Sequence, residues 1–322
     1  MKVLRVVVLG IASIAAIAMA GCGGGDGSAY FHNVSERSSW GFSDTLAFVS
    51  FGGNGQKYVW RCSKDGGSQV PLTIERDTTE PTNEGGFNPT FRPGQQQAVF
   101  SSRRAGGSVT LYVMDGLDGD RKAITALTNS GVAGQDIQAN YSADGNRIVY
   151  VTDKVIGGGT GTMDIVIMNA DGSSPAYEVA TDAIEQWPCF NPDGTKIAFN
   201  RGPSTGPTDI IIRNISTDEE VNLTAALRTG IGSATRFECP AWGVVGGEEW
   251  IYFHSNRAGD FDLYRVRPDG SSLQQITSDL RSDGFPVLST DATTLIFTRD
   301  RELWSRSAVP GATEETRLTR RY

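Results

Sequence analysis

A unit of about 50 residues recurs six times along this 322-residue chain, and it restricts the possible folds more than any other feature. Its clearest copy is an aromatic residue, a tight turn and an apolar run: Phe190-Asn-Pro-Asp-Gly194 followed by Ile197-Ala-Phe199. A fixed period of this size indicates one supersecondary unit that is repeated. The corresponding first residues stand 46 to 52 positions apart and are Phe42, Phe91, Tyr141, Phe190, Trp242 and Leu288.

Each unit is predicted to consist of four antiparallel strands. The apolar runs are short, rich in Val, Ile, Phe and Tyr, and bounded by Gly, Asp, Asn or Pro, which is typical of strands. Asp-Gly pairs such as Asp144-Gly145 and Asp171-Gly172 favour tight hairpins, and the units end in pairs such as Leu223-Thr224. No helical period is evident. The sequence therefore predicts an all-β fold, a six-bladed β-propeller of four-stranded antiparallel blades over residues 36–322.

Two strings resemble a known family. The segment from Phe190 to Phe199 and the string from Phe253 to Tyr264, Phe-His-Ser-Asn-Arg-Ala-Gly-Asp-Phe-Asp-Leu-Tyr, are similar to the WD40-like PD40 repeat of the bacterial TolB-like propellers. The resemblance implies the fold, but it is weak evidence for function because one propeller geometry hosts unrelated activities. TolB proteins carry an α/β domain before the propeller, and we expect none in this chain.

The first 21 residues are predicted to be a lipoprotein signal peptide. Lys2 and Arg5 precede an apolar stretch, and Met19-Ala-Gly-Cys22 resembles the site at which the thiol of Cys22 is acylated. The alternative, an anchor helix, is disfavoured because the apolar run is shorter than the roughly 20 residues that span a bilayer. Residues 22–35 then form a Gly-rich tether. We expect an exported, membrane-anchored protein facing the periplasm, and Gly after Cys22 resembles the signal for the outer membrane.

Composition restricts the partners. The net charge of −8 disfavours nucleic acid and anionic membrane surfaces. Three further cysteines, Cys62, Cys189 and Cys239, leave at least one thiol without an intramolecular partner. A disulfide remains open, but small buried thiols are the favoured interpretation.

Little in the sequence points to catalysis. The only histidines are His32 and His254, which are too few for a zinc or histidine-rich metal site. The string from Gly202 to Gly206 matches the hydrolase pattern Gly-x-Ser-x-Gly, but another strand follows it where the mechanism requires a helix. The strand-initial aromatic residues are interpreted as packing between blades rather than as a sugar-stacking series. We expect no metal, no cofactor and no catalytic residue.

The topology predicts where a binding face lies. In a four-stranded meander, the links between blades and the loops between strands two and three open on one face, here called the funnel face; the Asp-Gly hairpins open on the opposite turn face. Polar residues near the start of the inner strands are expected to surround the channel mouth: Asp136, Gln138, Glu185, Gln186, Arg236, Glu238 and Asp283. Basic residues are expected farther out on the rim: Arg103, Arg104, Lys154, Arg201, Arg257 and Arg299.

Two interpretations of this charge pattern stay open: solvated loop charges, or a polar funnel for a peptide or small cationic group. In the second, Asp136, Glu185 and Asp283 form the binding hot spot, and their mutual repulsion raises one or more pKa values unless a cation compensates. The favoured function is a non-enzymatic, monomeric envelope lipoprotein that binds a protein or peptide partner. The alternatives are a propeller lyase or hydrolase acting on envelope glycan or peptide, and a purely structural scaffold.

Overall fold

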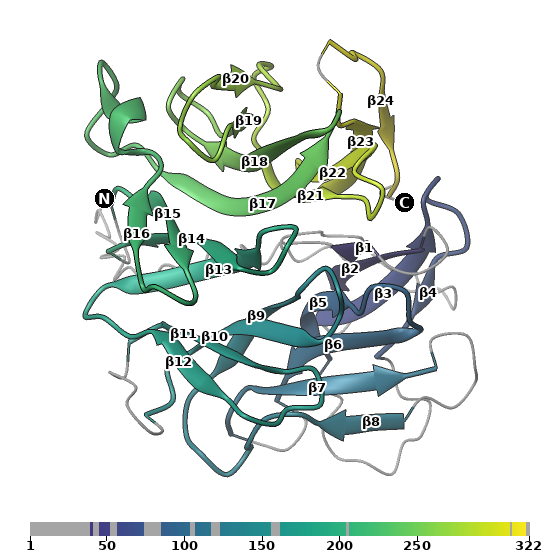
Figure 1. Cartoon of the computed structure of the whole chain (residues 1–322). Coiled ribbons are helices and arrows are strands. Elements are labelled where there is room, and N and C mark those ends of the chain that lie inside the picture. The colour runs from purple at the N-terminus through teal and green to yellow at the C-terminus, as the bar shows by residue number, and fades with distance from the viewer. Residues whose placement is uncertain are drawn as a thin grey trace, which may run out of the picture.

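The computed structural model describes residues 39–40, 45–51, 57–73, 85–103, 107–116, 123–155, 162–203, 206–309 and 311–319. These residues form six four-stranded antiparallel sheets, each built from four consecutive strands. The predicted six-bladed β-propeller is therefore confirmed. The inner strand of every blade lies toward the middle of the molecule and the fourth strand lies at the periphery (Figure 1).

The first three blades use twelve strands. Blade 1 contains β1(Ser39–Trp40), β2(Thr45–Phe51), β3(Lys57–Ser63) and β4(Val70–Pro71). Blade 2 contains β5(Phe87–Phe91), β6(Gln97–Ser102), β7(Thr110–Asp115) and β8(Ala123–Ala126). Blade 3 contains β9(Asp136–Tyr141), β10(Arg147–Thr152), β11(Asp164–Asn169) and β12(Ala176–Val179).

The last three blades follow the same plan. Blade 4 contains β13(Ile184–Phe190), β14(Lys196–Gly202), β15(Asp209–Asn214) and β16(Glu220–Asn222). The 3-10 helix η2(Ala225–Arg228) follows, and it is the only helix among the described residues. Blade 5 contains β17(Phe237–Val245), β18(Glu248–Ser255), β19(Asp262–Val266) and β20(Gln274–Gln275). Blade 6 contains β21(Asp283–Leu288), β22(Thr294–Arg299), β23(Glu302–Ser307) and β24(Glu315–Arg317).

Two repeated sequence signals have clear structural roles. In the hairpin turns, Gly145 and Gly194 adopt φ values of 70° and 72°, which glycine tolerates without a steric penalty. In the Leu-Thr pairs that end the units, the leucine is buried. The threonine hydroxyl accepts a hydrogen bond from the backbone N–H of the first apolar residue in the third strand. Thr224 Oγ1 accepts from Ile210 N at 3.0 Å, and Thr319 Oγ1 accepts from Leu303 N at 2.8 Å. A side chain thus satisfies a buried backbone donor where the short fourth strand has ended.

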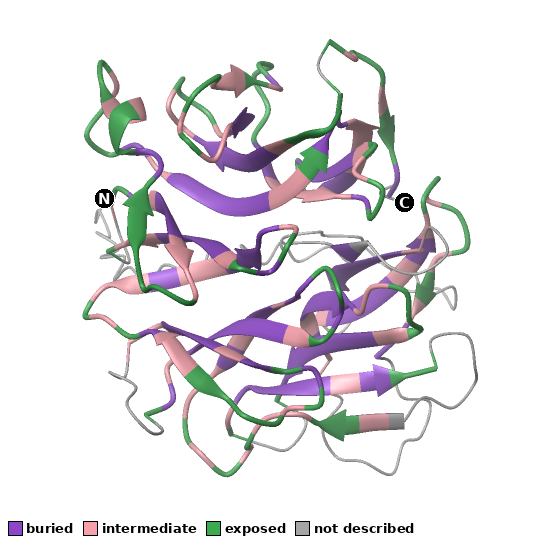
Figure 2. Ribbon diagram, viewed as in Figure 1, coloured by how far each residue is buried: buried purple, intermediate pink, exposed green. Residues whose placement is uncertain are grey.

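The core lies between neighbouring blades, because both faces of each sheet are covered. The anchors Phe91, Tyr141 and Phe190 are 3–6% exposed and belong to three separate inter-blade clusters. Figure 2 shows the buried strands inside and the exposed residues on turns and outer strands. These aromatic residues pack as predicted. Cys62, Cys189 and Cys239 are also buried and unbridged, and burial raises the pKa of the Cys62 thiol to about 12.

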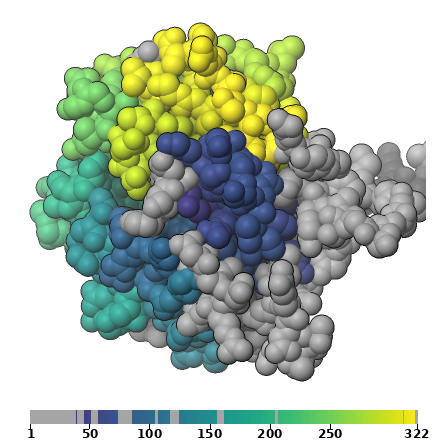
Figure 3. Space-filling model, turned by 90° about the vertical axis from the view of Figure 1, so that its right-hand side faces the viewer, coloured from purple at the N-terminus to yellow at the C-terminus, as the bar shows by residue number. Residues whose placement is uncertain are grey.

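Among the described strands, the ring closes by packing between blades 1 and 6 and not by an exchanged strand. Blade 1 and blade 6 each use four strands from their own end of the chain, and Leu46, Trp60 and Leu318 share one apolar cluster. Figure 3 shows the dark-blue first blade directly against the yellow last blade. Gly66 lies so close to Leu318 that a Cβ at this position would be 2.1 Å from the Leu318 carbonyl oxygen.

The N-terminal predictions lie outside the described residues. The signal peptide, Cys22, the tether and His32 belong to the segment before residue 39. In the part of the chain that is described, no helix has the length and apolar character needed to cross a membrane.

Candidate functional site

A β-bulge at the same level of five inner strands shapes the channel mouth. Each bulge contains a non-glycine residue with φ between 48° and 57°: Asn88, Gln138, Trp187, Cys239 and Phe285. The strand register shifts at each of these places. Such conformations cost roughly 1–2 kcal/mol per residue, so their repetition around one ring marks a candidate functional site.

Six side chains at this level form one continuous chain of contacts across the channel. Gln138 Oε1 accepts from the N–H of Trp187 at 2.7 Å, and the ring of Trp187 meets that of Phe285 edge-on at 5.2 Å between centroids. Because Trp187 belongs to blade 4 and Phe285 to blade 6, this contact joins two blades that are not consecutive in the chain. Both rings are half-buried. We call the set Gln138, Trp187, Phe285, His254, Glu238 and Arg236 the mouth cluster.

Blade 5 supplies the polar half of the mouth cluster. His254 Nδ1 accepts from the N–H of Phe285 at 3.2 Å, and its Nε2 lies 3.5 Å from Glu238 Oε2. Arg236 Nη2 donates to Glu238 Oε1 at 2.6 Å. Burial alone would raise the pKa of Glu238, but His254 and Arg236 outweigh it and lower this pKa. Glu238 is therefore an ionised carboxylate with cationic and imidazole partners, and the mouth cluster has little net charge.

The three predicted hot-spot carboxylates are each neutralised within their own blade. Asp136 lies 2.6 Å from Lys154 Nζ, and Glu185 Oε1 lies 2.8 Å from Arg201 Nε. Asp136, Glu185 and Asp283 are at most 2% exposed. Their carboxylates are therefore structural partners of buried or partly buried bases in the blades. Burial raises the pKa of Glu185 despite Thr181 and Arg201, and it raises the pKa of Asp283 despite Arg299.

The predicted basic rim divides into different environments. Lys154 and Arg299 are each 1% exposed, so they are buried partners of the acids and do not form an outer ring. Arg201 is partly exposed and also pairs with Glu220 at 2.6 Å. Arg103 is exposed, Arg257 is half-buried beside the ring of Tyr264, and Arg104 lies outside the described residues.

The pairing of these acids with their bases follows a spacing that is visible in the sequence. Glu185 pairs in register with Arg201, and Asp283 pairs with Arg299, so both partners are 16 residues apart. Asp136 pairs in register with Thr152, also 16 residues on, while Lys154 reaches back to the carboxylate. One hairpin length thus brings an acid at the start of the inner strand next to a base at the end of the second strand.

Trp187, Phe285 and His254 were missed as site residues, although proline marks the bulges. Pro89, Pro188, Pro240 and Pro286 directly follow four of the five positive-φ residues. Proline lacks an N–H and is confined within sheets to edges and bulges. A proline two residues before four of the anchors would therefore have located these bulges, but the contacts between rings from separate blades depend on the closed propeller.

Comparisons with known proteins agree with this architecture. No protein-family model matches the chain. An uncharacterized protein of Agrobacterium fabrum, Atu1656, is 29% identical over 156 residues, which are 48% of this chain and 48% of that protein. A TolB homolog of Chlorobaculum tepidum is 28% identical over 193 residues, covering 54% of this chain and 41% of the homolog. These matches therefore span less than half the length of either relative.

Solved structures show the same fold. The structure described as putative TolB from Agrobacterium tumefaciens has a TM-score of 0.59 at 22% identity, covering 74% of this chain and 82% of that chain. TolB from Acinetobacter baumannii also gives 0.59, at 19% identity, with coverages of 78% and 56%. The described part of this chain is thus a six-bladed β-propeller with a ring of bulges at its channel mouth. More particularly, its propeller is TolB-like.

Proposed function

We propose that this propeller binds a protein or peptide partner through the mouth cluster on its funnel face. The observation that carries the proposal is the Trp187–Phe285 pair, two half-buried rings presented at the channel mouth by strained bulges. Aromatic residues held by a rigid scaffold supply large contact areas at a small entropic cost and commonly dominate binding energy. The matches to TolB homologs support a periplasmic setting and a protein partner.

Neighbouring residues extend this surface. Leu280, in the link between β20 and β21, is 94% exposed and lies on the same face by topology. Gln186 and Arg236 are partly exposed beside the rings, and Arg103, Arg201 and Arg257 lie farther out. In this proposal the partner contacts these side chains, whereas Asp136, Glu185 and Asp283 hold the mouth in shape through their ion pairs. The partner therefore meets an aromatic centre of little net charge with arginines around it, so salt should weaken binding only through the outer arginines.

Site-specific photo-crosslinking in the cell envelope tests the proposal. A photoreactive residue at position 280 reports on the funnel face, and one at the exposed Val244, near the hairpin of blade 5, reports on the turn face. We expect a protein adduct at position 280 that disappears in the Trp187→Ala background, and none at position 244. An adduct at position 244 alone, or one at 280 that is indifferent to Trp187→Ala, would refute the proposed face.

The second candidate function is an enzyme, and one contact favours it. His254 and Glu238 form a titratable pair at the mouth, and propellers in puromycin hydrolase and in a manganese complex of oligogalacturonate lyase share the fold, each with a TM-score of 0.58. Their 15% and 13% identities establish the fold alone. Within the described ranges, no group of three His, Cys, Asp or Glu side chains is arranged to hold a metal. Turnover of envelope glycan or peptide that is abolished by His254→Gln would favour the enzyme.

We also propose that the protein is held at the membrane by acylated Cys22. The support is the sequence pattern around Met19-Ala-Gly-Cys22. The Gly-rich tether would let the propeller stand away from the lipid surface. This proposal is independent of the funnel face and is tested separately below.

A further inference from the structure

A cavity lies on the propeller axis, beyond the mouth cluster. Its volume is about 190 Å³, and its lining comes from the inner strands of all six blades. In blades 2 to 6 the lining residues follow the bulge, so the Trp187–Phe285 pair lies on the funnel side and the cavity opens on the turn face. Its rim consists of the second residue after the anchor in four blades: Pro93, Ala143, Pro192 and Thr290.

One wall of this turn-face cavity carries hydrogen-bonding side chains among apolar ones such as Phe91 and Ala139. Thr90 in blade 2 and Asn140 in blade 3 line it, and neither side chain hydrogen-bonds to another described residue. Asn191 also lines the cavity, but its side chain already has a hydrogen-bond partner, since its Oδ1 accepts from Lys196 N at 2.8 Å. Thr90 and Asn140 therefore have unused donors and acceptors on the cavity side.

The opposite wall is apolar. In a ring of six blades taken in chain order, blades 2 and 3 face blades 5 and 6. Blades 5 and 6 contribute Trp242, Val287 and Leu288, which are all half-buried and line the cavity. The cavity thus has an apolar side at blades 5 and 6 and, across the axis, a side at blades 2 and 3 where hydrogen-bonding groups stand among apolar residues.

The lining contains no Asp, Glu, Lys, Arg or His. A charged ligand would lose hydration here without gaining a counter-charge, which is unfavourable. The volume is below the roughly 300–1,000 Å³ of sites for drug-sized molecules, so the occupant is about the size of one six-membered ring. A neutral pyranose has these properties: its C–H face is apolar, and its hydroxyl groups form a hydrogen-bonding edge.

We propose that the turn-face cavity binds a single neutral sugar ring, with its C–H face against Trp242 and Leu288 and its hydroxyl groups at Asn140 and Thr90. The anchors Phe91, Tyr141 and Phe190 also line this cavity, but they are buried and their rings pack between blades. Trp242 occupies the same register and is half-buried, so the proposal departs from the packing interpretation for this one aromatic anchor. The site thus includes anchor residues. It is separate from the proposed partner site at the opposite end of the axis.

Saturation-transfer NMR and tryptophan fluorescence with the mature protein test this inference, using glucose, N-acetylglucosamine and the charged analogue glucuronate as probes. We expect saturable binding of a neutral sugar with a Kd of about 1 mM, since so few atoms are buried, and at least about tenfold weaker binding of glucuronate. Asn140→Leu should weaken binding about fivefold or more by removing the amide without enlarging the cavity.

Blocking variants provide the structural control. Ala143 is exposed on the rim, so Ala143→Trp should abolish sugar binding without altering the core; Thr290→Trp, also exposed, is the second variant if the first does not fold. Leu280→Asp, on the other face, should leave sugar binding unchanged while impairing partner binding. Equal binding of glucuronate, retained binding in a folded blocked variant, or no saturable signal up to about 50 mM would each overturn the inference; the last result would mean that the cavity holds only water.

Discussion

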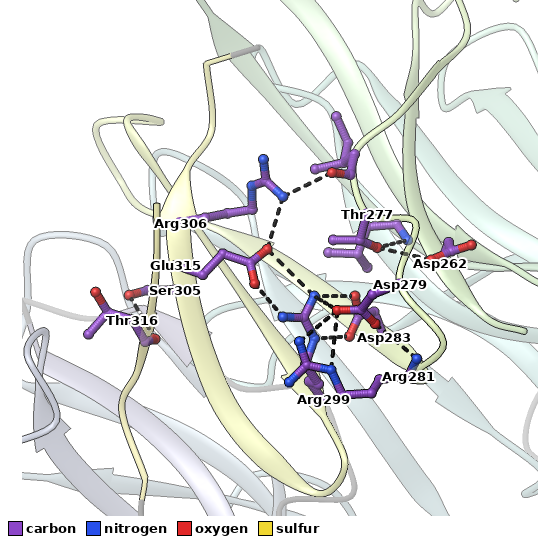
Figure 4. A network of polar contacts seen from close by, with 12 residues as sticks. Asp262, Thr277, Asp279, Arg281, Asp283, Arg299, Ser305, Arg306, Glu315 and Thr316 are labelled. Atoms are coloured by element: carbon purple, nitrogen blue, oxygen red, sulfur yellow. Dashed lines mark hydrogen bonds and ion pairs between the residues drawn. The ribbon is translucent and has the colours of Figure 1, made fainter. Parts of the chain in front are cut away.

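Arg299 and Asp283 form a two-point ion pair inside blade 6, with Nε–Oδ1 and Nη2–Oδ2 distances that are both 2.6 Å. Both side chains are at most 1% exposed. The same guanidinium also contacts Glu315 (Figure 4). Its Cζ lies 5.3 Å from the centroid of the Trp304 ring. Arg299 therefore connects the inner strand, the second strand and the outer strand of its blade, so its role in folding is direct.

Arg299→Met is expected to lower the free energy of unfolding by about 3–5 kcal/mol, because it leaves the buried carboxylate of Asp283 without its cation. Arg201→Met is the matched control: Arg201 holds the same register in blade 4, but its side chain is 22% exposed, so water can replace part of the pairing. Urea denaturation at pH 7 measures both. The double variant Asp283→Asn with Arg299→Met should be less destabilised than Arg299→Met alone, and equal losses at positions 201 and 299 would contradict this account.

Asp262 should give the stability of the protein an unusual pH dependence. Burial, and then the charge of Asp283, raises the pKa of Asp262 to about 6. The folded protein therefore holds this proton more tightly than the unfolded chain, whose Asp pKa is about 3.9. It follows that the contribution of Asp262 to stability falls as pH rises through the interval between about 4 and 6.

Asp262→Asn should remove this fall, which corresponds to about 1–2 kcal/mol between pH 4.5 and 7.5 after allowance for solvent screening. Denaturant midpoints across that range provide the measurement. Asp291→Asn is the control of opposite sign, because hydrogen bonds from Ser289 and Thr293 lower the pKa of the Asp291 carboxylate in an exposed turn. If the denaturant midpoints of the parent and of Asp262→Asn changed in parallel with pH, Asp262 would not be the source of the fall in stability.

Gly66 tests how the ring is closed. Gly66→Ala should lower the free energy of unfolding by more than the roughly 1–2 kcal/mol expected from left-handed backbone strain. The reason is that its new Cβ would meet the Leu318 carbonyl across the junction of blades 1 and 6. Gly94→Ala isolates the strain alone: Gly94 has φ +70°, and no atom lies within 4 Å of the place that its new methyl group would occupy. Thermal melting of both variants should show a clearly larger loss for Gly66→Ala. Similar losses of thermal stability in the two variants would mean that the junction of blades 1 and 6 shifts to make room for the methyl group.

Cys22→Ala should release the protein from the membrane fraction into the soluble fraction. Durable anchoring requires two or more acyl chains, and the substitution removes the thiol that would carry them. Fractionation of cells expressing the parent and the variant, with Cys62→Ala as a cysteine control, provides the measurement. A Cys22→Ala protein that stays with the membrane would show that acylation is not the anchor.

The sequence by itself determined the blade and the number of blades. Residues such as Gly145 and Thr224 act locally: one permits a tight turn, and the other satisfies the nearest strand N–H. These requirements hold wherever the blade is placed, so the period of about 50 residues was sufficient for the fold. The spacing of 16 between Glu185 and Arg201 was equally local and would have predicted their pairing.

Only the tertiary structure decided which surfaces the channel presents. Trp187 and Phe285 are 98 positions apart in the sequence and come from non-adjacent blades, so nothing short of the closed ring brings their rings into contact. Asp136, Glu185 and Asp283 also lie against the preceding blade, because their N–H groups donate to the carbonyl oxygens of Val109, Met163 and Phe261. The charge pattern was therefore visible in the sequence, but its exposure was not, because exposure is a property of how the blades pack and not of the order of residues along one blade.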